Sequence, residues 1–324
     1  MKLYRNLTDI GTDAHGGVVV IGNFDGIHRG HQALIRDAAA LAETHQAPLV
    51  IMTFEPHPRQ YFAPDSAPFR LATFRDKARL LQGLGVGHLL ALRFDETLAQ
   101  ESAEDFINAR LINGLRAKHV MVGQDFRFGH KRQGDETLMR QSLSAAGIGF
   151  TAMPVVGDAD GVLSSSRVRQ FLGAGAVDDA ASILGRPVTF GGVVQMGAQR
   201  GRTIDFPTAN IAIDPLLKRP AYGVYAVRAA VAEDKIEASE PTNWWSGIAN
   251  IGRRPTVDGV SELLEVHLFD AQPDLYDQYL RVELVAFIRP EQKFDDFEQL
   301  KQQIVQDAAQ ARALLAEAYA SNPP

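Results

Sequence analysis

Two histidines, His28 and His31, are one helical turn apart in the segment Ile21–Gln32, which reads IGNFDGIHRGHQ. An apolar run before the segment predicts a buried strand, and an alanine-rich run after it predicts a helix. Imidazoles at a helix N-terminus, beside free N–H groups and the positive end of the dipole, can hydrogen-bond phosphate oxygens. Gly22 and Gly26 allow the backbone to approach such a ligand closely. Two solvated histidines would show the same spacing, but the glycine-flanked position after a strand favours a phosphate site.

Three other segments of the first half carry polar groups beside apolar runs. Met52–Pro58 reads MTFEPHP, and the prolines on both sides of His57 would stiffen the loop. Val122–Gly134 reads VGQDFRFGHKRQG and offers Asp125 together with basic side chains. Leu163–Arg169 reads LSSSRVR, and its serines and arginines could clamp a triphosphate. Taken alone, the first is also a rigid turn, the second a solvated basic loop, and the third a capped helix start with surface charges.

The segment Leu184–Ile213 of the second half combines glycines with two hard oxygen donors. It reads LGRPVTFGGVVQMGAQRGRTIDFPTANIAI, and the backbone at Gly197 and Gly201 could wrap phosphates. Thr208 and Asn210 are two residues apart, so in an extended segment both face the same side and could reach one Mg²⁺ ion. A β-turn capped by a hydroxyl and an amide would show the same spacing.

Glu265 stands in an alternating segment, LLEVHLFD, where Leu263, Glu265 and His267 share one face of a predicted strand. A carboxylate in a strand core needs a partner or a task, and this one could act as a general base for an alcohol. A simply solvated strand face would also explain the alternation.

The first half of the chain alternates strand-like and helical segments. This order predicts a parallel sheet with helices on both faces, whose ligands bind at the carboxyl ends of the strands. The predicted strands are Gly17–Gly22, Pro48–Phe54, Val86–Leu92, His119–Gly123 and Ile148–Val155, and the predicted helices are Gln32–Thr44, Thr73–Leu84, Ala103–Leu111 and Glu136–Ala146.

The second half has short β-branched segments without intervening helices, which predicts a small antiparallel barrel. A closing helix follows, capped by Asp295 with Glu298 three residues on, and its apolar stripe, which starts at Phe297, should dock on the barrel. We expect domains at 1–184 and 185–324. The predicted barrel strands are Val188–Met196, Tyr222–Val231, Ser246–Ile251, Leu263–Phe269 and Leu280–Ile288, and Ala232–Trp245 is predicted to be a polar hairpin loop.

Composition limits the classes of protein to consider. A chain of 324 residues is too long for one ordinary core, and a net charge of -6 disfavours nucleic acid as the main partner. There is no cysteine, which excludes disulfides, thiolate metal sites and a thiol nucleophile. No apolar stretch predicts a signal peptide or a membrane span, so we expect a cytoplasmic protein without a membrane partner. The sequence does not determine the oligomeric state or a task for Trp244–Trp245.

The motifs of the first half resemble the HxGH superfamily of nucleotidyltransferases, and more closely the adenylyltransferase half of bacterial bifunctional riboflavin kinase/FMN adenylyltransferases. That family's G-x-F-D-G-x-H-x-G-H, T-F-x-P-H-P and V-G-x-D-F-x-F-G elements stand here in order, followed by a serine-rich motif in which Ser166 replaces the usual Thr. The resemblance implies a Rossmann-like α/β domain and ATP as co-substrate. The implied ATP contacts are Gly22, Phe24, Gly26, His28, His31, Ser165, Ser166, Arg169, Gly197 and Gly201, with His28 and His31 catalytic, and the implied flavin contacts are Asp125, Phe126, Phe128, Arg253 and Arg254.

The motifs of the second half resemble the riboflavin kinases of the same family: GRTIDFPTAN, GVYAV, NIGRRPT and EVH occur in the family's order. The resemblance implies a six-stranded Greek-key barrel in which Thr208 and Asn210 hold Mg²⁺. Glu265 would be the catalytic base that accepts the proton of the riboflavin hydroxyl. Two positions depart from the family, because Asp205 and Asp277 stand where glycine is usual.

The whole pattern implies an enzyme that phosphorylates riboflavin to FMN and then adenylylates FMN to FAD with release of pyrophosphate. Its partners would be riboflavin, FMN and ATP. Three alternatives use part of the same motifs: a chain in which only the adenylyltransferase works, a non-catalytic flavin sensor, and adenylyl transfer to nicotinamide mononucleotide. A sensor would be expected to lose His28, His31 or Glu265, and the third alternative leaves the barrel without a task.

Overall fold

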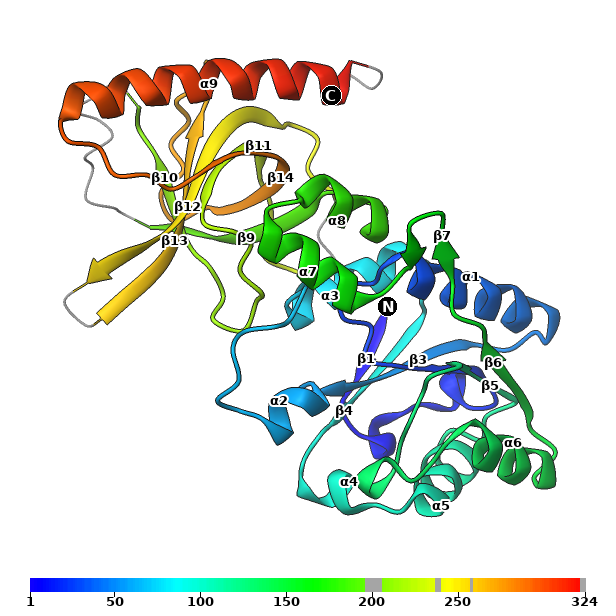
Figure 1. The fold of residues 1–324 in the computed structure, drawn as a ribbon. Helices are drawn as coiled ribbons and strands as arrows, with labels where there is room; N and C mark the ends of the chain where they lie inside the picture. The colour runs from blue at the N-terminus through cyan, green and yellow to red at the C-terminus, as the bar shows by residue number, and fades with distance from the viewer. Residues whose placement is uncertain (196–205, 237–239, 257–258, 321–324) are drawn as a thin grey trace. The chain divides into compact units, whose positions relative to one another are not determined.

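The computed structural model describes residues 1–195, 206–236, 240–256 and 259–320, with only the backbone of 254–256 and 259–261. The chain forms two compact units, one of Met1–Ala67 with Phe74–Ser164 and one of Pro68–Thr73 with Ser165–Pro324. Figure 1 shows the elements of each unit. Each unit is described by itself below.

The first unit is built on a six-stranded parallel sheet in the order β1-β4-β3-β2-β5-β6. The parallel α/β architecture predicted from the alternating segments is therefore confirmed. β2 reads VVVI and β3 reads LVIMTFE, and nearly every residue of both is buried, as expected for strands covered on both faces. The strands are β1 Lys2–Tyr4, β2 Val18–Ile21, β3 Leu49–Glu55, β4 His88–Arg93, β5 His119–Gly123 and β6 Gly149–Met153.

The helices of this unit connect the parallel strands. Residues 103–111, predicted as one helix, form a short α-helix that continues as a wider π-helix over Phe106–Gly114. The helices are α1 Arg29–Thr44, α2 Pro58–Phe62, α3 Phe74–Gly83, α4 Glu96–Gln100, α5 Ala103–Asp105 and α6 Glu136–Ala145, and a small hairpin of β7 Gly157–Asp158 and β8 Gly161–Val162 follows.

The strand order places the motifs of the first unit at one edge. From β2 the chain adds β3 and β4 on one side of the sheet and β5 and β6 on the other, so the order reverses beside β2. Ligands of such sheets bind outside the carboxyl ends of the strands at this reversal point. The segments after β2, β3 and β5 begin there, because all three strands are parallel.

The second unit contains a closed antiparallel barrel in the order β10-β13-β12-β11-β14-β9. Within it β14-β11-β12-β13 is the Greek-key order, in which the fourth strand returns beside the first. The predicted six-stranded barrel is confirmed. Its strands are β9 Val188–Gln195, β10 Ala209–Ala212, β11 Gly223–Val231, β12 Trp245–Thr256, β13 Gly259–Leu268 and β14 Tyr279–Pro290.

Two helices, α7 (Ser165–Ala174) and α8 (Val177–Leu184), belong to the second unit by their contacts. The sequence assigned them to the first domain, which was expected to end at 184. α8 packs against β9 and β14, and the N–H of Ala221 donates to the carbonyl of Leu172. These contacts, which no sequence pattern marks, hold the two helices on the barrel.

The closing helix α9 (Phe297–Tyr319) packs on the outside of the barrel along β11, β12 and β14 (Figure 1). Ala311 and Leu315 of the predicted stripe are buried against Val224 and Ile248. Phe297 was expected to belong to the stripe, but as the first residue of the helix it is 54% exposed.

The loop between β11 and β12 ends in the tryptophan pair whose role the sequence left open. The guanidinium group of Arg228 lies 4.9 Å from the Trp244 ring and 4.0 Å from the ring of Tyr319 near the end of α9. Trp245 begins β12 and pairs with Ala229. The pair therefore ties the loop to β11, and Arg228 also joins it to the helix.

The start of α9 differs from the prediction by one residue. Asp296, not Asp295, has the extended backbone of a helix cap, and its carboxylate accepts the N–H of Gln299 at 2.8 Å. The Gln299 amide donates back to the Asp296 carboxylate at 3.1 Å. The expected pairing of Asp295 with Glu298 is therefore wrong, because two adjacent aspartates suit a cap equally well and the docking of the helix selects one of them.

We expect Asp296→Ala to lower the free energy of unfolding of the barrel by about 1 kcal/mol, the usual loss for a helix cap. Asp295→Ala removes the same charge one residue earlier and should change it by no more than about half as much. Urea unfolding followed by circular dichroism measures both variants. Equal losses would contradict the assignment of the cap.

Candidate active sites

The two histidines of the first unit form one structural element at the start of α1. His28 is the cap residue, and its Nδ1 accepts the backbone N–H of His31 at 3.3 Å. The two rings stack with centroids 3.7 Å apart and planes inclined by 23°. A ring nitrogen that accepts a hydrogen bond carries no proton, so neutral His28 holds its proton on Nε2. That N–H is the donor that a phosphate oxygen requires.

The loop between β2 and α1 holds this pair in place with strained backbone. Phe24 and Ile27, both about 1% exposed, have φ angles of 49° and 42°, and Gly26 has a φ of 78°. Non-glycine residues seldom adopt positive φ, and such strain is concentrated at functional sites. The Phe24 ring also meets the edge of the His31 ring, with centroids 5.3 Å apart. The buried aromatic ring fixes both the loop and the imidazole.

Burial, the neighbouring His28 and the charge of Lys77, in that order, hold the pKa of His31 well below its ordinary value. His31 is therefore neutral at pH 7. Its Nδ1 is buried and has no hydrogen-bond partner among the described residues. Lys77 of α3 is fully buried, and the sequence did not mark it as a site residue because one lysine in an amphipathic helix has no distinctive pattern.

The other two loops at this edge differ in character. His57 caps α2, with its Nδ1 accepting the N–H of Arg59 at 3.1 Å, so this loop is the rigid turn considered for it. Asp125 is exposed, and the rings of Phe126 and Phe128 stack with centroids 5.6 Å apart. Phe128 belongs to the buried core of the unit. Flavin contacts of these three residues stay a prediction.

The predicted triphosphate clamp lies at the start of α7 in the second unit. Ser165 and Ser166 are the first residues of the helix. Arg169 donates its Nε–H to the carbonyl of Phe69 at 2.7 Å, and its guanidinium group lies 5.5 Å from the Phe69 ring. The arginine is thus oriented by its own unit. Its action together with His28 and His31 stays a prediction.

Glu265 occupies the centre of a polar row on the outer face of the barrel. Its register partners are Asn210 of β10 on one side and Asn250 of β12 on the other. Directly opposed residues of antiparallel strands point to the same face, so the carboxylate lies between two amides. The intervening Leu264 and Val266 are buried and face the barrel interior. Sequence reasoning did not select Asn250, although it begins the quoted NIGRRPT motif.

His267, two residues from Glu265 on the same face, holds the segment that carries the expected metal ligands. Its Nδ1 donates to the carbonyl of Pro207 at 2.9 Å, since a carbonyl oxygen can only accept. The ring also packs against Phe206, with centroids 4.9 Å apart. Sequence reasoning quoted His267 as part of EVH without a role. The structure makes it the anchor of Thr208 and Asn210.

The donor set at Thr208 and Asn210 fits a hard cation. The Asn210 amide nitrogen donates to the carbonyl of Thr208 at 3.3 Å, which identifies the other amide atom as the oxygen. A hydroxyl, an amide oxygen and the carboxylate of the neighbouring Glu265 are all ligands that Mg²⁺ accepts. No group of three or more His, Asp or Glu side chains suited to a metal occurs in the described part of the chain. The predicted Mg²⁺ site therefore depends on the side-chain oxygens of Thr208 and Asn210 and not on a cluster of acidic or histidine side chains.

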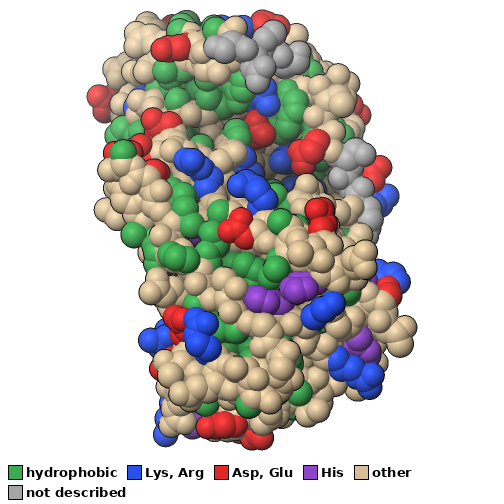
Figure 2. Space-filling model, turned by 90° about the vertical axis from the view of Figure 1, so that its right-hand side faces the viewer, with side chains coloured by type: hydrophobic (Ala, Val, Ile, Leu, Met, Phe, Trp, Pro, Cys, Tyr) green, Lys and Arg blue, Asp and Glu red, His purple; other side chains and the backbone are tan. Residues whose placement is uncertain are grey.

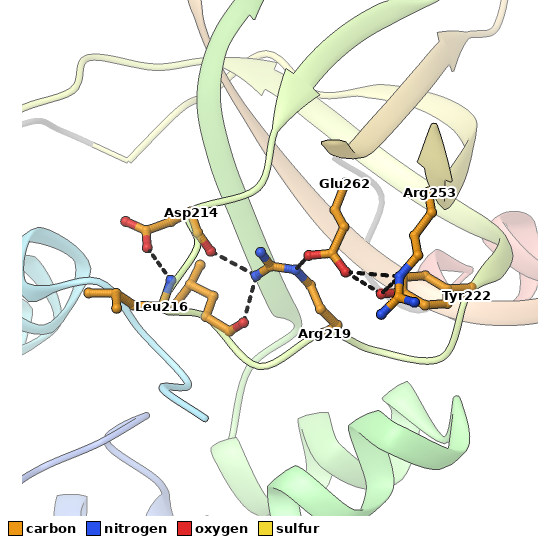
Figure 3. Close-up of polar contacts among 7 residues, drawn as sticks. Asp214, Leu216, Arg219, Tyr222, Arg253 and Glu262 are labelled. Atoms are coloured by element: carbon orange, nitrogen blue, oxygen red, sulfur yellow. Dashed lines mark hydrogen bonds and ion pairs between the residues drawn. The ribbon is translucent and has the colours of Figure 1, made fainter. Parts of the chain in front are cut away.

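Arg253 belongs to a network that converges on Glu262 of β13 (Figure 3). Its side chain is 64% exposed, and its Nε lies 3.5 Å from the Glu262 carboxylate and donates to the Tyr222 hydroxyl at 3.0 Å. Arg219 donates to the same carboxylate at 2.5 Å, and the Tyr222 hydroxyl donates to it as well. Burial alone would raise the pKa of Glu262, but these donors hold it below its ordinary value. The carboxylate stays ionised and fixes Arg253.

Some of the expected site residues cannot be placed. Gly197, Gly201 and Asp205 lie outside the described residues, as does the side chain of Arg254. Asp277 is described and has a φ of 60°, so it does occupy the left-handed region that favours glycine. Aspartate is among the residues that tolerate this region best, and the chain keeps the turn at a modest cost.

The face of the molecule drawn in Figure 2 carries Lys and Arg side chains interspersed with Asp and Glu side chains. Charges of both signs agree with the small negative net charge of -6. Among the described residues, no helix combines the length and apolar character that crossing a membrane requires.

Comparison with known proteins gives the family. Models for FAD synthetase and riboflavin kinase match residues 11–167 and 184–315. The bifunctional riboflavin kinase/FMN adenylyltransferase of Escherichia coli K12 is 41% identical over 315 residues, which are 96% of this chain and 97% of that protein. Those of Haemophilus influenzae and Bacillus subtilis are 38% and 35% identical, over 97% and 91% of this chain and 99% and 91% of theirs. The chain belongs to the bifunctional riboflavin kinase/FMN adenylyltransferase family.

A crystal structure of a Streptococcus pneumoniae protein described as a macrolide-efflux protein has the same fold. It aligns with a TM-score of 0.82 and 32% identity over 94% of this chain and 96% of that one. The efflux description belongs to that protein, because fold alone does not carry function.

The two activities of the family are riboflavin kinase and FMN adenylyltransferase, which use ATP and make FMN and FAD. The bifunctional enzyme predicted from the sequence is confirmed. Both halves are matched at the family level, so a sensor and an enzyme for nicotinamide mononucleotide no longer explain the chain.

The glycine between the two histidines of this bifunctional enzyme has a steric role that sequence reasoning missed. A Cβ at Gly30 would lie 3.1 Å from two atoms of the His28 ring and 3.4 Å from the carbonyl oxygen of Leu163. A Cβ at residue 30 would therefore push the His28 ring by a few tenths of an ångström from its stacked position. The signal was present in the sequence as the third letter of HRGH.

We expect Gly30→Ala to displace the His28 ring and to reduce FMN adenylylation by about tenfold or more, because small misplacements of catalytic groups are costly. Riboflavin phosphorylation in the same sample should be unchanged. Gly83→Ala is the matched control, since a Cβ at this helical glycine meets nothing within 4 Å. Chromatographic assay of both reactions tests this, and equal rates for the two variants would contradict it.

Proposed function

We propose that the His28–His31 pair binds the ATP phosphates during FMN adenylylation. The FMN phosphate attacks the α-phosphorus and pyrophosphate leaves, so no protein nucleophile is needed. The observation that carries the proposal is the hydrogen bond from the His31 N–H to Nδ1 of His28, which leaves the His28 Nε2–H as a donor. Donors fixed before reaction stabilise the charge that develops in the transition state. Gly22, Phe24 and Gly26 shape the loop that presents them.

Ser165, Ser166 and Arg169 would contact the same phosphates as hydroxyl and guanidinium donors. The hydrogen bond from Arg169 to the Phe69 carbonyl supports a fixed guanidinium group. Asp125, Phe126 and Phe128 would form the flavin side, with the first two accessible and the third supporting them from the core.

In the kinase half, we propose that Glu265 accepts the proton of the terminal ribityl hydroxyl of riboflavin as that oxygen attacks the γ-phosphorus of ATP. Its place between Asn210 and Asn250 supports this role, because two amides can orient a carboxylate without neutralising it. Thr208 and Asn210 would hold Mg²⁺, which screens the phosphate charge when bound. His267 keeps their segment in position through Pro207. Arg253, fixed by Glu262, and Arg254 would contact the flavin, and Gly197 and Gly201 the nucleotide phosphates.

By the family matches, the kinase domain of this proposal begins near 185 and the adenylyltransferase domain covers 1–184, although α7 and α8 of that range pack with the barrel in the second unit. We place both reactions in the cytoplasm, on the ground that both consume ATP.

We expect Glu265→Gln to slow riboflavin phosphorylation by about 10²- to 10⁴-fold, the usual contribution of a general base. FMN adenylylation by the same sample should survive, which serves as an internal control for protein quality. Glu298→Gln makes the same change at an exposed position of α9 and should leave both rates unaltered. Separate assays with riboflavin and with FMN measure the two reactions. FMN production by the Glu265 variant at the rate of the Glu298 variant would remove Glu265 as the base.

A further inference from the structure

The short segment Pro68–Thr73 belongs to the second unit, although the chain on both sides of it folds into the first. Its backbone pairs with the loop of residues 213–222, which joins β10 to β11. The N–H of Arg70 donates to the carbonyl of Leu216 at 3.1 Å, and the N–H of Lys218 donates to the carbonyl of Arg70 at 2.7 Å. Arg70 is 3% exposed, so the segment is a packed part of the second unit and not a loose connection.

This segment holds the arginine of the predicted triphosphate clamp. The carbonyl of Phe69 accepts the Nε–H of Arg169 at 2.7 Å, and the Phe69 ring lies 5.5 Å from the guanidinium group. The helix that carries Arg169 is itself attached to the 213–222 loop, because the N–H of Ala221 donates to the carbonyl of Leu172 at 2.9 Å. The position of Arg169 therefore depends on this loop in two ways, through Phe69 and through α7.

One arginine fixes the 213–222 loop to the barrel (Figure 3). Arg219 donates from Nε to the Glu262 carboxylate of β13 at 2.5 Å. Its Nη1 donates to the carbonyls of Asp214 and Leu217 at 2.7 Å and 2.6 Å. A planar guanidinium group serves such acceptors in fixed directions, which a flexible ammonium group does not. Leu217 stands between the two loop residues that pair with Arg70, so Arg219 fixes the point at which the loop holds the segment.

We propose that Arg219, in the riboflavin kinase half of the chain, is a positioning residue for FMN adenylylation. Its ion pair with Glu262 fixes the loop, and the loop holds Pro68–Thr73. That segment in turn orients Arg169. The inference rests on the proposed contact of Arg169 with the ATP phosphates. A guanidinium group that is oriented before ATP arrives loses less conformational entropy when it binds.

The surroundings of Glu262 make this role separable from folding. The Tyr222 hydroxyl and Arg253 also donate to the Glu262 carboxylate. Removal of Arg219 therefore releases the loop without leaving a buried carboxylate unpaired, which is the event that usually makes the loss of an ion pair costly. We expect the barrel to fold without the Arg219 guanidinium group.

The test compares Arg219→Met with Arg312→Met, which removes another arginine–carboxylate pair of the same unit, since Arg312 of α9 lies 2.6 Å from Asp270. For Arg219→Met we expect the KM for ATP in FMN adenylylation to rise about fivefold or more, because small displacements of a binding group are costly. Riboflavin phosphorylation by the same sample should stay within about twofold of its rate, because Glu262 keeps its other two donors.

A double variant separates positioning from a general loosening of the protein. In an Arg169→Met background, adding Arg219→Met should alter the KM for ATP by less than about twofold, because the group that Arg219 positions is already gone. A merely structural role would give the same loss in both backgrounds.

Four outcomes decide the inference. A raised KM that disappears in the Arg169→Met background supports it. If Arg219→Met matches Arg312→Met, or if its effect is the same with and without Arg169, the inference is overturned. If circular dichroism shows that Arg219→Met does not fold, Glu262→Gln weakens the same ion pair at constant size, and an unchanged KM or an equal effect in both backgrounds overturns the inference. Normal adenylylation by Arg169→Met alone would refute the phosphate clamp and the inference with it, whereas an impaired Arg169→Met beside an unimpaired Arg219→Met refutes the inference alone.

Discussion

The hydrogen bond from the backbone N–H of His31 to Nδ1 of His28 is the interaction on which the ATP site proposed for the first unit depends. It caps α1, selects the protonated nitrogen of His28 and sets the stacked distance of 3.7 Å between the rings. The strained backbone at Phe24 and Ile27, and the absence of a side chain at Gly30, are conditions for it. One neutral hydrogen bond thus couples the start of α1 to the phosphate recognition that we propose for the pair.

In the barrel, strand register positions the proposed site residues, where a helix cap does so in the first unit. Register in an antiparallel sheet decides which side chains stand next to each other, and it places Glu265 between Asn210 and Asn250. His267 then attaches the loop before β10 to the same strand through Pro207. In the first unit a helix end organises the donors, whereas here three strands organise a carboxylate and its expected metal ligands. In both units, hydrogen bonds and strand register hold the proposed site residues in place, which is what catalysis by positioning requires.

In the comparisons, a protein can share the fold of this chain without sharing the description of its function. The Streptococcus pneumoniae structure shares the architecture at a TM-score of 0.82 and carries a description unrelated to flavins. The curated bacterial relatives match both halves of the chain at 35% to 41% identity and are named for the two flavin reactions. The histidine pair and Glu265 have the surroundings that the roles proposed for them need. Function is therefore argued from the sites and not from the fold.

The sequence by itself determined the two architectures, the bifunctional family and the residues at each strand end, because strand and helix periods and ordered motifs are local signals. Other features depend on contacts between distant segments, and only the tertiary structure decided them. Packing selected Asp296 over Asp295 as the cap, and it attached α7 and α8 to the barrel. Lys77, an ordinary helical lysine in the sequence, is fully buried and helps to lower the pKa of His31, because the free energy of a charge depends on its surroundings and not on its neighbours along the chain.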